Sequence, residues 1–254
     1  MCGGSTEKRS LETQGIKANG VVQAMDFLSQ QTKVLHGKKI KNQILATDKN
    51  VIVIGGGDTG SDCIGTSNRQ GAKSVRNFEI MPKPPGQRSP STPWPYWPLQ
   101  LKTSSSHKEG CDRNWLINTK KFITDEKGNL TGLMTIGVEW KIVPNERPRL
   151  VEIKGSEEVF KCELALLALG FTGPEKTLSS ELGIELDNRS NYKAKYGKYQ
   201  TNIPNIFTAG DMRRGQSLIV WAISEGREAA RQVDIFLMGD SSLPTKEGGD
   251  LPSL

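Results

Sequence analysis

An apolar run that breaks into closely spaced glycines is the feature that most constrains the fold of this chain. Residues 51–54 read Val-Ile-Val-Ile, and the next six residues have the pattern G-x-G-x-x-G. A short β-branched run is typical of a strand buried in a parallel sheet. Gly55 would permit a tight turn, Gly57 the close approach of a pyrophosphate, and Gly60 the close packing of helix on strand. The stretch therefore predicts a dinucleotide-binding turn between a strand and a helix.

The residues that follow favour this interpretation over an ordinary glycine-rich turn. Asp58 and Thr59 begin a segment whose pattern, up to Gln70, predicts the helix. The first backbone N–H groups of that helix would face the phosphates. Residues 74–80 predict a second strand, which carries Glu79. Strand, turn, helix, strand and acid thus occur in the order of a nucleotide-binding unit.

Glu79 also bears on the choice of pyridine nucleotide. It follows the turn by about 20 residues, where an acidic residue accepts hydrogen bonds from the adenosine ribose. Because a carboxylate repels a 2′-phosphate, we expect NAD(H) rather than NADP(H). Lys83 and Arg88 follow closely in the sequence, and their positive charges leave NADP(H) as the alternative.

Composition and charge argue against several other classes of protein. The chain has 254 residues, of which 35% are hydrophobic, and no apolar run approaches the roughly 18 residues that span a membrane. Its first residues hold no apolar core of a secretory signal, so we expect a soluble, cytoplasmic protein. The net charge of +6 comes from Lys and Arg scattered among Asp and Glu. This pattern favours a solvated basic surface over an acidic partner, and it argues against nucleic-acid binding.

The cysteines and histidines form no recognisable metal or redox motif. No two cysteines have C-x-x-C spacing, which argues against a zinc or iron–sulfur site and against a dithiol redox centre. We expect reduced thiols, with Cys63 as a packing residue of the helix after the turn. His36 and His107 lie in polar surroundings and are expected at the surface. The four cysteines are Cys2, Cys63, Cys111 and Cys162.

Two further regions have strong local signatures. Residues 20–35 have a partly apolar face and predict a helix. Residues 82–98 hold seven of the 13 prolines, together with Trp94, Tyr96 and Trp97. Proline fixes φ and removes backbone donors, which excludes a helix or a central strand. We expect an ordered loop with buried aromatic rings, over the nucleotide-binding domain or at a subunit contact, in preference to an exposed polyproline ligand.

The segment between residues 115 and 169 is rich in strand patterns. The Gly155-Ser156 pair predicts a hairpin between two of these strands. The last strand is nearly all apolar and ends at Gly170, an expected cofactor-binding residue. The predicted strands cover residues 115–124, 130–141, 150–154, 159–161 and 163–169.

A second motif ends in a Gly-Asp pair. A short apolar strand that begins at residue 205 would close with Gly210 and Asp211. A long helix follows, with Ser217 as a suitable N-cap. Glu225 and other charged residues would lie mainly on the side opposite its apolar stripe. The predicted stripe comprises Leu218, Ile219, Ala222, Ile223, Ala229, Ala230 and Val233.

These motifs together resemble the small (β) subunit of glutamate synthase and the C-terminal module of plant and fungal NADH-dependent glutamate synthases. The Pro-Trp-Pro insert and the long Gly-Asp motif are more specific than the glycine turn, and the resemblance covers most of residues 1–238. It implies an α/β fold: a three-layer, Rossmann-like NAD-binding domain of a two-dinucleotide-fold flavoprotein, with a partial FAD domain. The matching stretches are residues 55–67, 69–73, 93–98 and 210–226.

The resemblance implies an electron-input module that passes hydride from NAD(P)H to FAD and needs no catalytic side chain. Electrons would then pass through iron–sulfur clusters to a large subunit, which makes L-glutamate from 2-oxoglutarate and glutamine-derived ammonia. Gly210 and Asp211 would contact the ribityl–phosphate region of FAD. The backbone of Gln216, Ser217 and Leu218 would face the flavin pyrimidine, where the dipole of the following helix would stabilise reduced flavin.

The resemblance also implies that part of such a subunit is missing. The family's first FAD glycine turn and its cysteine-rich iron–sulfur region would precede residue 1. We therefore expect a C-terminal half, with the large subunit or the remaining half as partner and with iron–sulfur clusters only there. The expected division is a partial FAD-domain segment and linker helix at 1–46, the NAD(P)-binding domain at 47–171, the returning FAD-domain segment at 172–240 and a flexible tail at 241–254.

Other functions remain open. A disulfide reductase would use a C-x-x-C pair, which the sequence lacks. A pyrimidine- or ferredoxin-linked reductase built on the same module would lack the Pro-Trp-Pro insert. A catalytically silent nucleotide-binding or assembly protein would keep the NAD-binding domain without flavin chemistry, and it would purify as a colourless protein that still binds NADH.

Overall fold

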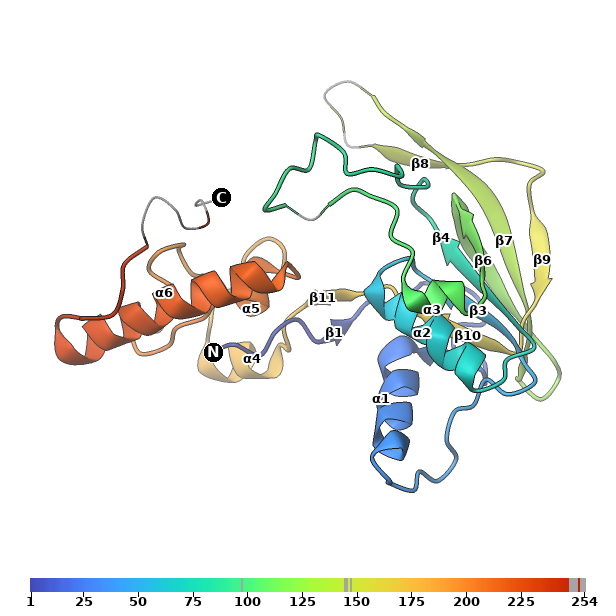
Figure 1. Ribbon diagram of the computed structural model, residues 1–254, viewed down its shortest axis with the longest axis horizontal. Helices are drawn as coiled ribbons and strands as arrows, with labels where there is room; N and C mark the ends of the chain where they lie inside the picture. Colours follow the sequence, from blue (N-terminus) through green and yellow to red (C-terminus); the bar gives the residue numbers. More distant parts are fainter. Residues whose placement is uncertain (97, 144–145, 147, 247–250, 252–254) are drawn as a thin grey trace. The chain divides into compact units, whose positions relative to one another are not determined.

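The computed structural model describes residues 1–96, 98–143, 146, 148–246 and 251. Within these residues the chain forms two compact units. The colours of Figure 1 follow the sequence, so the segments of each unit can be found there by their residue numbers. We call them the sheet unit and the terminal unit. The sheet unit comprises Ser10–Gln87 and Gln100–Gly170, and the terminal unit comprises Met1–Arg9, Arg88–Leu99 and Phe171–Leu254.

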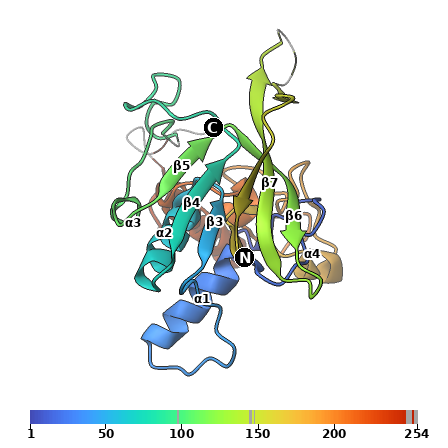
Figure 2. The same cartoon turned by 90° about the vertical axis from the view of Figure 1, so that its right-hand side faces the viewer.

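A parallel sheet, five-stranded in the described residues, forms the centre of the sheet unit. Its order is β2-β10-β3-β4-β5, so β3, which leads into the glycine turn, lies in the middle. Figure 2 shows β3, β4 and β5 side by side. The strands are β2 (Val21–Gln23), β3 (Asn50–Ile54), β4 (Ser74–Glu79), β5 (Asp112–Trp115) and β10 (Leu164–Leu167).

Both faces of this sheet are covered, which gives the sheet unit three layers in the described chain. On one face, Val53 belongs to the same buried cluster as Phe27 of α1 and Ile64 of α2. On the other face, Ile52 is buried together with Phe122 of the antiparallel strands. Burial on both faces explains why β3 and β10 read as continuous apolar runs. The helices of this unit are α1 (Ala24–Leu35), α2 (Asp58–Arg69) and α3 (Ser105–Lys108).

The antiparallel layer is built around its longest strand, β7. This strand pairs with β6 on one side and with β8 and then β9 on the other. The predicted hairpin at Gly155-Ser156 is therefore wrong, because β8 and β9 follow one another along β7. The Ser156 hydroxyl accepts a hydrogen bond from Gly137 N at 2.9 Å, which attaches the turn to β7 itself. The strands are β6 (Ile117–Thr124), β7 (Leu130–Lys141), β8 (Arg149–Glu152) and β9 (Glu158–Lys161).

Two other predicted elements differ from the structure. The helix predicted at residues 20–35 begins only at Ala24, because Val21–Gln23 pair in parallel with β10 and become an edge strand. The strand predicted at 115–124 is two strands, because Leu116 has φ of 59° and turns the chain from one sheet to the other. Residues 10–46 accordingly fold with the sheet unit, whereas the expected boundary lay at residue 46.

The terminal unit is built from short segments and one long helix. β1 (Glu7–Lys8) pairs antiparallel with β11 (Phe171–Gly173). Buried clusters hold the rest together, one around Tyr192 and Met212 and another around Tyr199. The helices are α4 (Thr177–Leu182), α5 (Asp211–Arg214) and α6 (Ile219–Met238).

The region of the Gly-Asp motif also differs from its prediction. The segment predicted as a strand from residue 205 forms an isolated bridge, Phe207 with Gln200, and Asp211 already belongs to α5. The N-cap of α6 is Leu218 rather than Ser217, since both the amide and the hydroxyl of Ser217 bond to Asp211.

Some predictions concern residues beyond the described part of the chain. Trp97 of the Pro-Trp-Pro insert lies outside it, and so do residues 247–250 and 252–254 of the predicted tail. In the part of the chain that the structure describes, no helix combines the length and the apolar character needed to cross a bilayer.

Candidate functional site

The predicted glycine turn joins β3 to α2 at the carboxyl end of the parallel sheet. Gly55 has φ of 116°, and a Cβ atom there would lie 2.2 Å from the carbonyl oxygen of Ala168. A Cβ atom at Gly60 would lie 2.3 Å from the carbonyl oxygen of Gly55. Both distances are far below van der Waals contact, so the fold itself requires glycine at these two positions.

Gly57 stands in a different environment from the other two glycines. A Cβ atom placed on it would meet no described heavy atom within 4 Å. Gly57 is also the N-cap of α2, and the first intrahelical bond runs from Ser61 N to its carbonyl oxygen at 3.0 Å. The N–H groups of Asp58, Thr59 and Gly60 therefore have no intrahelical partner. The turn offers open space beside free backbone donors, which is the arrangement that binds phosphates.

Glu79 lies beside the turn, as the sequence predicts. One carboxylate oxygen accepts the N–H of Gly56 at 2.6 Å, and the other accepts the N–H of Met81 at 3.1 Å. Sequence reasoning missed Asn77, whose buried amide donates to the carbonyl oxygens of Val53 and Gly55. A polar residue within a strand that is buried on both faces was the available signal.

Gly170 lies at the same edge of the sheet. It follows β10, whose continuation at Ala168 donates a backbone hydrogen bond to the carbonyl oxygen of Ile54 at 2.8 Å. The φ of Gly170 is 75°, so this position also favours glycine. The structure thus brings together Gly55, Gly57, Asp58, Thr59, Gly60, Glu79 and Gly170 at the carboxyl ends of β3, β4 and β10.

The two basic residues that left NADP(H) open already have partners. The Lys83 ammonium lies 5.1 Å from the centre of the Trp115 ring. The Arg88 guanidinium donates to the carbonyl oxygens of Thr92 and Tyr96 within its own loop. Both side chains thus have contacts within the described chain.

The second predicted site, in the terminal unit, is a cavity of about 370 Å³. Gly210 has φ of 67° and ψ of −147°, a backbone conformation that favours glycine. One carboxylate oxygen of Asp211 accepts the N–H of Ser217 at 3.2 Å and so closes the loop between α5 and α6. The cavity is lined by Cys2, Gly4, Ala209, Gly210, Asp211, Ser217, Leu218, Ile219 and Ala222.

The beginning of α6 borders this cavity. The first backbone bond of the helix runs from Trp221 N to the carbonyl oxygen of Leu218 at 3.0 Å. The N–H groups at the start of this 20-residue helix therefore lack intrahelical partners, and the positive end of its dipole lies at the cavity. Gln216 is not among the residues that line the cavity, and its side-chain amide donates to the carbonyl oxygen of Phe171 at 2.6 Å.

A buried carboxylate supports the Gly-Asp turn from behind. Glu225 is 0% exposed, which corrects its predicted place on the solvent side of α6. It accepts bonds from Gly210 N at 3.0 Å, from Arg213 Nε at 2.9 Å and from Arg214 Nε at 2.9 Å. Burial alone would raise the pKa of Glu225, but bonds to the two guanidinium groups outweigh it and hold the pKa below its usual range.

The predicted apolar stripe of α6 is also wrong in part. The buried residues of this helix are Trp221, Glu225 and Ala229, which are spaced four apart. Ile219 and Ile223 are exposed by 75% and 56%. The helix is therefore rotated relative to the face that hydrophobicity alone predicts, because the buried face holds the ion pair.

The proline-rich insert packs against α6 within the terminal unit. The indole N–H of Trp221 donates to the carbonyl oxygen of Pro95 at 3.2 Å. Trp94 and Tyr96 are exposed by 65% and 45%, so their rings are not buried within this chain, and a subunit contact of the loop stays a prediction. Among the described tryptophans the buried one is Trp221, and the centre of its ring lies 4.1 Å from the Arg214 guanidinium carbon.

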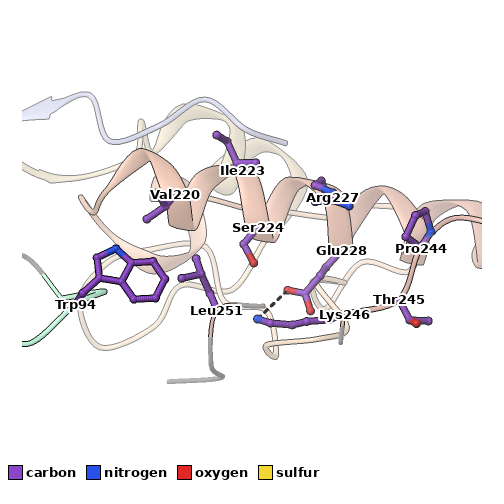
Figure 3. Close-up of a pocket in the computed structure, with 10 residues that line it drawn as sticks. All are labelled: Trp94, Val220, Ile223, Ser224, Arg227, Glu228, Pro244, Thr245, Lys246 and Leu251. Carbon is purple, nitrogen blue, oxygen red and sulfur yellow. Dashed lines mark ion pairs between the residues drawn. The ribbon is translucent and has the colours of Figure 1, made fainter. Parts of the chain in front are cut away.

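A further cavity of about 280 Å³ also lies along α6 (Figure 3). Its lining includes the ion pair between Glu228 and Lys246, at 3.9 Å, and the exposed ring of Trp94. The Tyr199 hydroxyl donates to Glu228 at 2.5 Å. Among the described residues, none of the predicted cofactor-binding positions lines this cavity.

The cysteines have free thiols, and Cys63 and Cys162 are buried. Burial raises the pKa of each of these two thiols to about 12. His107 is less exposed than predicted, because its ring forms part of a capping box with Ser104 at the start of α3. Within the described residues, His, Cys, Asp and Glu side chains form no cluster able to hold a metal ion.

Comparisons with known proteins show which proteins this chain is similar to. The family model for pyridine nucleotide-disulphide oxidoreductase matches residues 126–226. The NADH glutamate synthase of Schizosaccharomyces pombe is 44% identical over 256 residues, which cover 98% of this chain and 12% of that protein. The NADPH glutamate synthase small chain of Mycobacterium tuberculosis is 44% identical over 250 residues, which cover 96% of this chain and 50% of that protein.

A solved structure extends the comparison to the fold. Thioredoxin reductase of T. acidophilum matches with a TM-score of 0.61 at 17% identity, covering 91% of this chain and 63% of that one. At this identity the likeness concerns the fold alone. The chain spans about half the length of the bacterial relative that it matches. It is thus homologous, over nearly its whole length, to part of the glutamate synthase small chain, and it has the fold of the pyridine nucleotide-disulphide oxidoreductases.

Proposed function

We propose that this chain is the electron-input part of a glutamate synthase. A pyridine nucleotide binds at the β3–α2 turn, FAD binds at the Gly210–Asp211 turn, and hydride passes from the nucleotide to the flavin. The observation that carries the proposal is the presence of two glycine turns, each beside a helix start with free N–H groups, in a chain 44% identical to glutamate synthases.

The β3–α2 turn fits a dinucleotide. Gly57 leaves open space where a pyrophosphate would sit, and the free N–H groups of Asp58 and Thr59 would bind its oxygens. Glu79 is held beside the turn by Gly56 and Met81. Its carboxylate would accept hydrogen bonds from the ribose hydroxyls of the adenosine.

The Gly210–Asp211 cavity fits part of a flavin nucleotide. A volume of about 370 Å³ bordered by Asp211, Ser217 and Leu218 combines polar groups with a helix N-terminus. FAD, when bound, would accept two electrons as a hydride and would pass them on one at a time. The dipole of α6 would stabilise negative charge at that end of the cavity.

The residues of this chain contribute binding and orientation to the reaction. Hydride transfer between two ring systems depends on stacking and distance rather than on proton transfer by a side chain. We therefore assign no catalytic side chain. In the complete enzyme, a large subunit or the remaining half of the protein would receive the electrons, through iron–sulfur clusters, for synthesis of L-glutamate from glutamine and 2-oxoglutarate.

We further propose a preference for NADH. The fixed carboxylate of Glu79 would repel a 2′-phosphate, and Lys83 and Arg88 already have partners. The names of the relatives do not decide the matter, since the fungal protein is named for NADH and the mycobacterial one for NADPH.

The test is to titrate the purified chain with FAD and with NADH, and then to mix the FAD-loaded protein anaerobically with NADH. We expect binding of both compounds and loss of the visible flavin absorbance on mixing. A colourless chain that binds NADH but not FAD would overturn the proposal in favour of a nucleotide-binding protein without flavin chemistry. A chain that binds neither compound would overturn both functions.

A further inference from the structure

We propose that Glu225 is a positioning residue for the flavin site. Its carboxylate bonds to Gly210 of the Gly-Asp turn and holds this turn in the conformation that receives the cofactor. This inference rests on the proposed function, because it assigns to the same cavity the residue that shapes it. Glu225 does not line the cavity, so its effect on the cofactor acts through Gly210 and Asp211.

Glu225 bonds to residues that come before and after Asp211 in the sequence. One carboxylate oxygen accepts the N–H of Gly210 at 3.0 Å and Arg213 Nε at 2.9 Å. The other accepts Arg214 Nε at 2.9 Å and a second nitrogen of Arg213. Asp211 lies between these anchored residues, so its backbone is fixed before and after it.

The same carboxylate ties three segments into one unit. Glu225 belongs to α6, its arginine partners belong to α5, and Gly210 is the residue before α5. Asp211 in turn holds the amide of Ser217, just before α6 begins. The cavity wall formed by Gly210, Asp211, Ser217 and Leu218 is thus attached to a carboxylate in the second turn of the helix.

The charge of the cluster explains why a neutral substitute would not suffice. Glu225 is 0% exposed, and the side chains of Arg213 and Arg214 are exposed by 12% and 17%. Within the described cluster, these two guanidinium groups face this one carboxylate. Removal of its charge leaves partly buried cations without a counterion, which is costly and displaces them. Because both arginines belong to α5, their displacement would move Asp211.

An alternative explanation is that Glu225 serves only stability. Glu228, one turn later on α6, separates the two explanations, because it also accepts a short bond from a buried residue, Tyr199, but does not touch the Gly-Asp turn. If Glu225 serves only stability, Glu225→Gln and Glu228→Gln should both lower the stability of the protein, and both should keep the FAD affinity of the wild type. A positioning role predicts that the affinity falls in Glu225→Gln alone.

The experiment measures three quantities on the whole chain: the Kd for FAD, the visible circular dichroism of bound FAD, and the thermal midpoint of the flavin-free protein. We expect Glu225→Gln to weaken FAD binding about tenfold to a hundredfold, since it weakens charged hydrogen bonds that shape the turn. We also expect an altered dichroism spectrum for the flavin that still binds. Glu228→Gln should keep both the affinity and the spectrum of the wild type. Equal FAD affinity in the wild type and Glu225→Gln would overturn the inference.

A measurement on the wild type covers the case in which Glu225→Gln does not fold. Gly210 is the residue before α5, and its N–H donates to the Glu225 carboxylate. Amide hydrogen exchange in the flavin-free chain should therefore show protection of this N–H. Rapid exchange of Gly210, as in an exposed loop, would overturn the inference without a variant. Failure of the wild type to bind FAD would instead overturn the proposed function, and the positioning role with it.

Discussion

Gly56 donates its backbone N–H to the carboxylate of Glu79 across 2.6 Å, and this bond joins the glycine turn to the end of the neighbouring strand. A Cβ atom at Gly56 would lie 2.7 Å from that same oxygen. The acidic residue and the turn are therefore parts of one site, joined by this bond. The orientation of the carboxylate, and not only its position in the sequence, supports a role in nucleotide selection.

The first prediction concerns Glu79→Gln. This variant keeps an oxygen that can accept the Gly56 N–H but loses the negative charge beside the ribose. We expect the ratio of NADPH affinity to NADH affinity to rise by about tenfold or more, because NADH loses a charged acceptor and NADPH loses a repulsion. Fluorescence titration of the chain with each nucleotide measures the ratio.

The matched control for this variant is Glu109→Gln. Glu109 is also a carboxylate of the sheet unit, but it pairs with Arg69 at the far end of α2. It should leave the nucleotide ratio unchanged. If Glu79→Gln also leaves the ratio unchanged, Glu79 does not select the nucleotide.

The second prediction separates the glycines needed for folding from the one needed for binding. Gly60→Ala should lower the free energy of unfolding by about 1–3 kcal/mol, because its methyl group would meet the carbonyl oxygen of Gly55. Gly57→Ala should leave stability nearly unchanged, since its methyl group would point into open space. That space is where the pyrophosphate is expected, so Gly57→Ala should weaken NADH binding about tenfold.

Urea unfolding and NADH titration of the two variants test this separation. Wild-type NADH affinity in a folded Gly57→Ala protein would show that no phosphate group lies over this residue. If Gly60→Ala has the stability of the wild type, the turn must move far enough to relieve the contact between the new methyl group and the carbonyl oxygen of Gly55.

The glycine turn could be predicted from the sequence because its constraints are local. The positive φ of Gly55 and the close contact at Gly60 arise within a few residues, or against an adjacent strand of the same sheet. The edge strand at Val21–Gln23 could not be predicted in this way. Its conformation depends on pairing with β10, more than 140 residues later in the chain, and this contact overrides the local helical pattern.

At the flavin site, contacts between helices matter more than local constraints. Gly210 and Asp211 follow from a motif, but the orientation of α6 depends on an ion pair that hydrophobicity does not report. Trp221, Glu225 and Ala229 are four residues apart and share the buried face. That spacing, with a pair of arginines in the preceding motif, was the signal in the sequence. Its meaning became clear only when the structure placed α5 against α6.

The third prediction concerns acid stability. The pKa of Glu225 lies below its usual range in the folded protein, so the unfolded chain binds a proton more readily. The stabilisation is fully present above the unfolded-state pKa of about 4.3 and is lost as the pH falls through the folded-state pKa. Wild-type stability should therefore decrease as the pH falls below about 4.3, and Glu225→Gln should lack this part of the decrease.

Urea unfolding at a series of pH values, in both proteins, measures the difference. Other carboxylates with lowered pKa values contribute with the same sign in both proteins, so their effects cancel in the comparison. A difference in stability that does not change with pH would contradict a charged Glu225 in the folded state. The other carboxylates are Asp125, Glu152 and Glu163.

The last prediction uses Cys2 as a reporter of the flavin cavity. Cys2 is exposed and lines the same cavity as Gly210, whereas Cys63 and Cys162 are buried and burial raises the pKa of both thiols to about 12. Iodoacetamide should therefore label Cys2 first. At an FAD concentration ten times the Kd, about a tenth of the sites stay free, so labelling of Cys2 should slow about tenfold. Cys111, in the sheet unit, is the internal control. Peptide mass spectrometry follows both sites, and an unchanged Cys2 rate with FAD bound would place the flavin elsewhere.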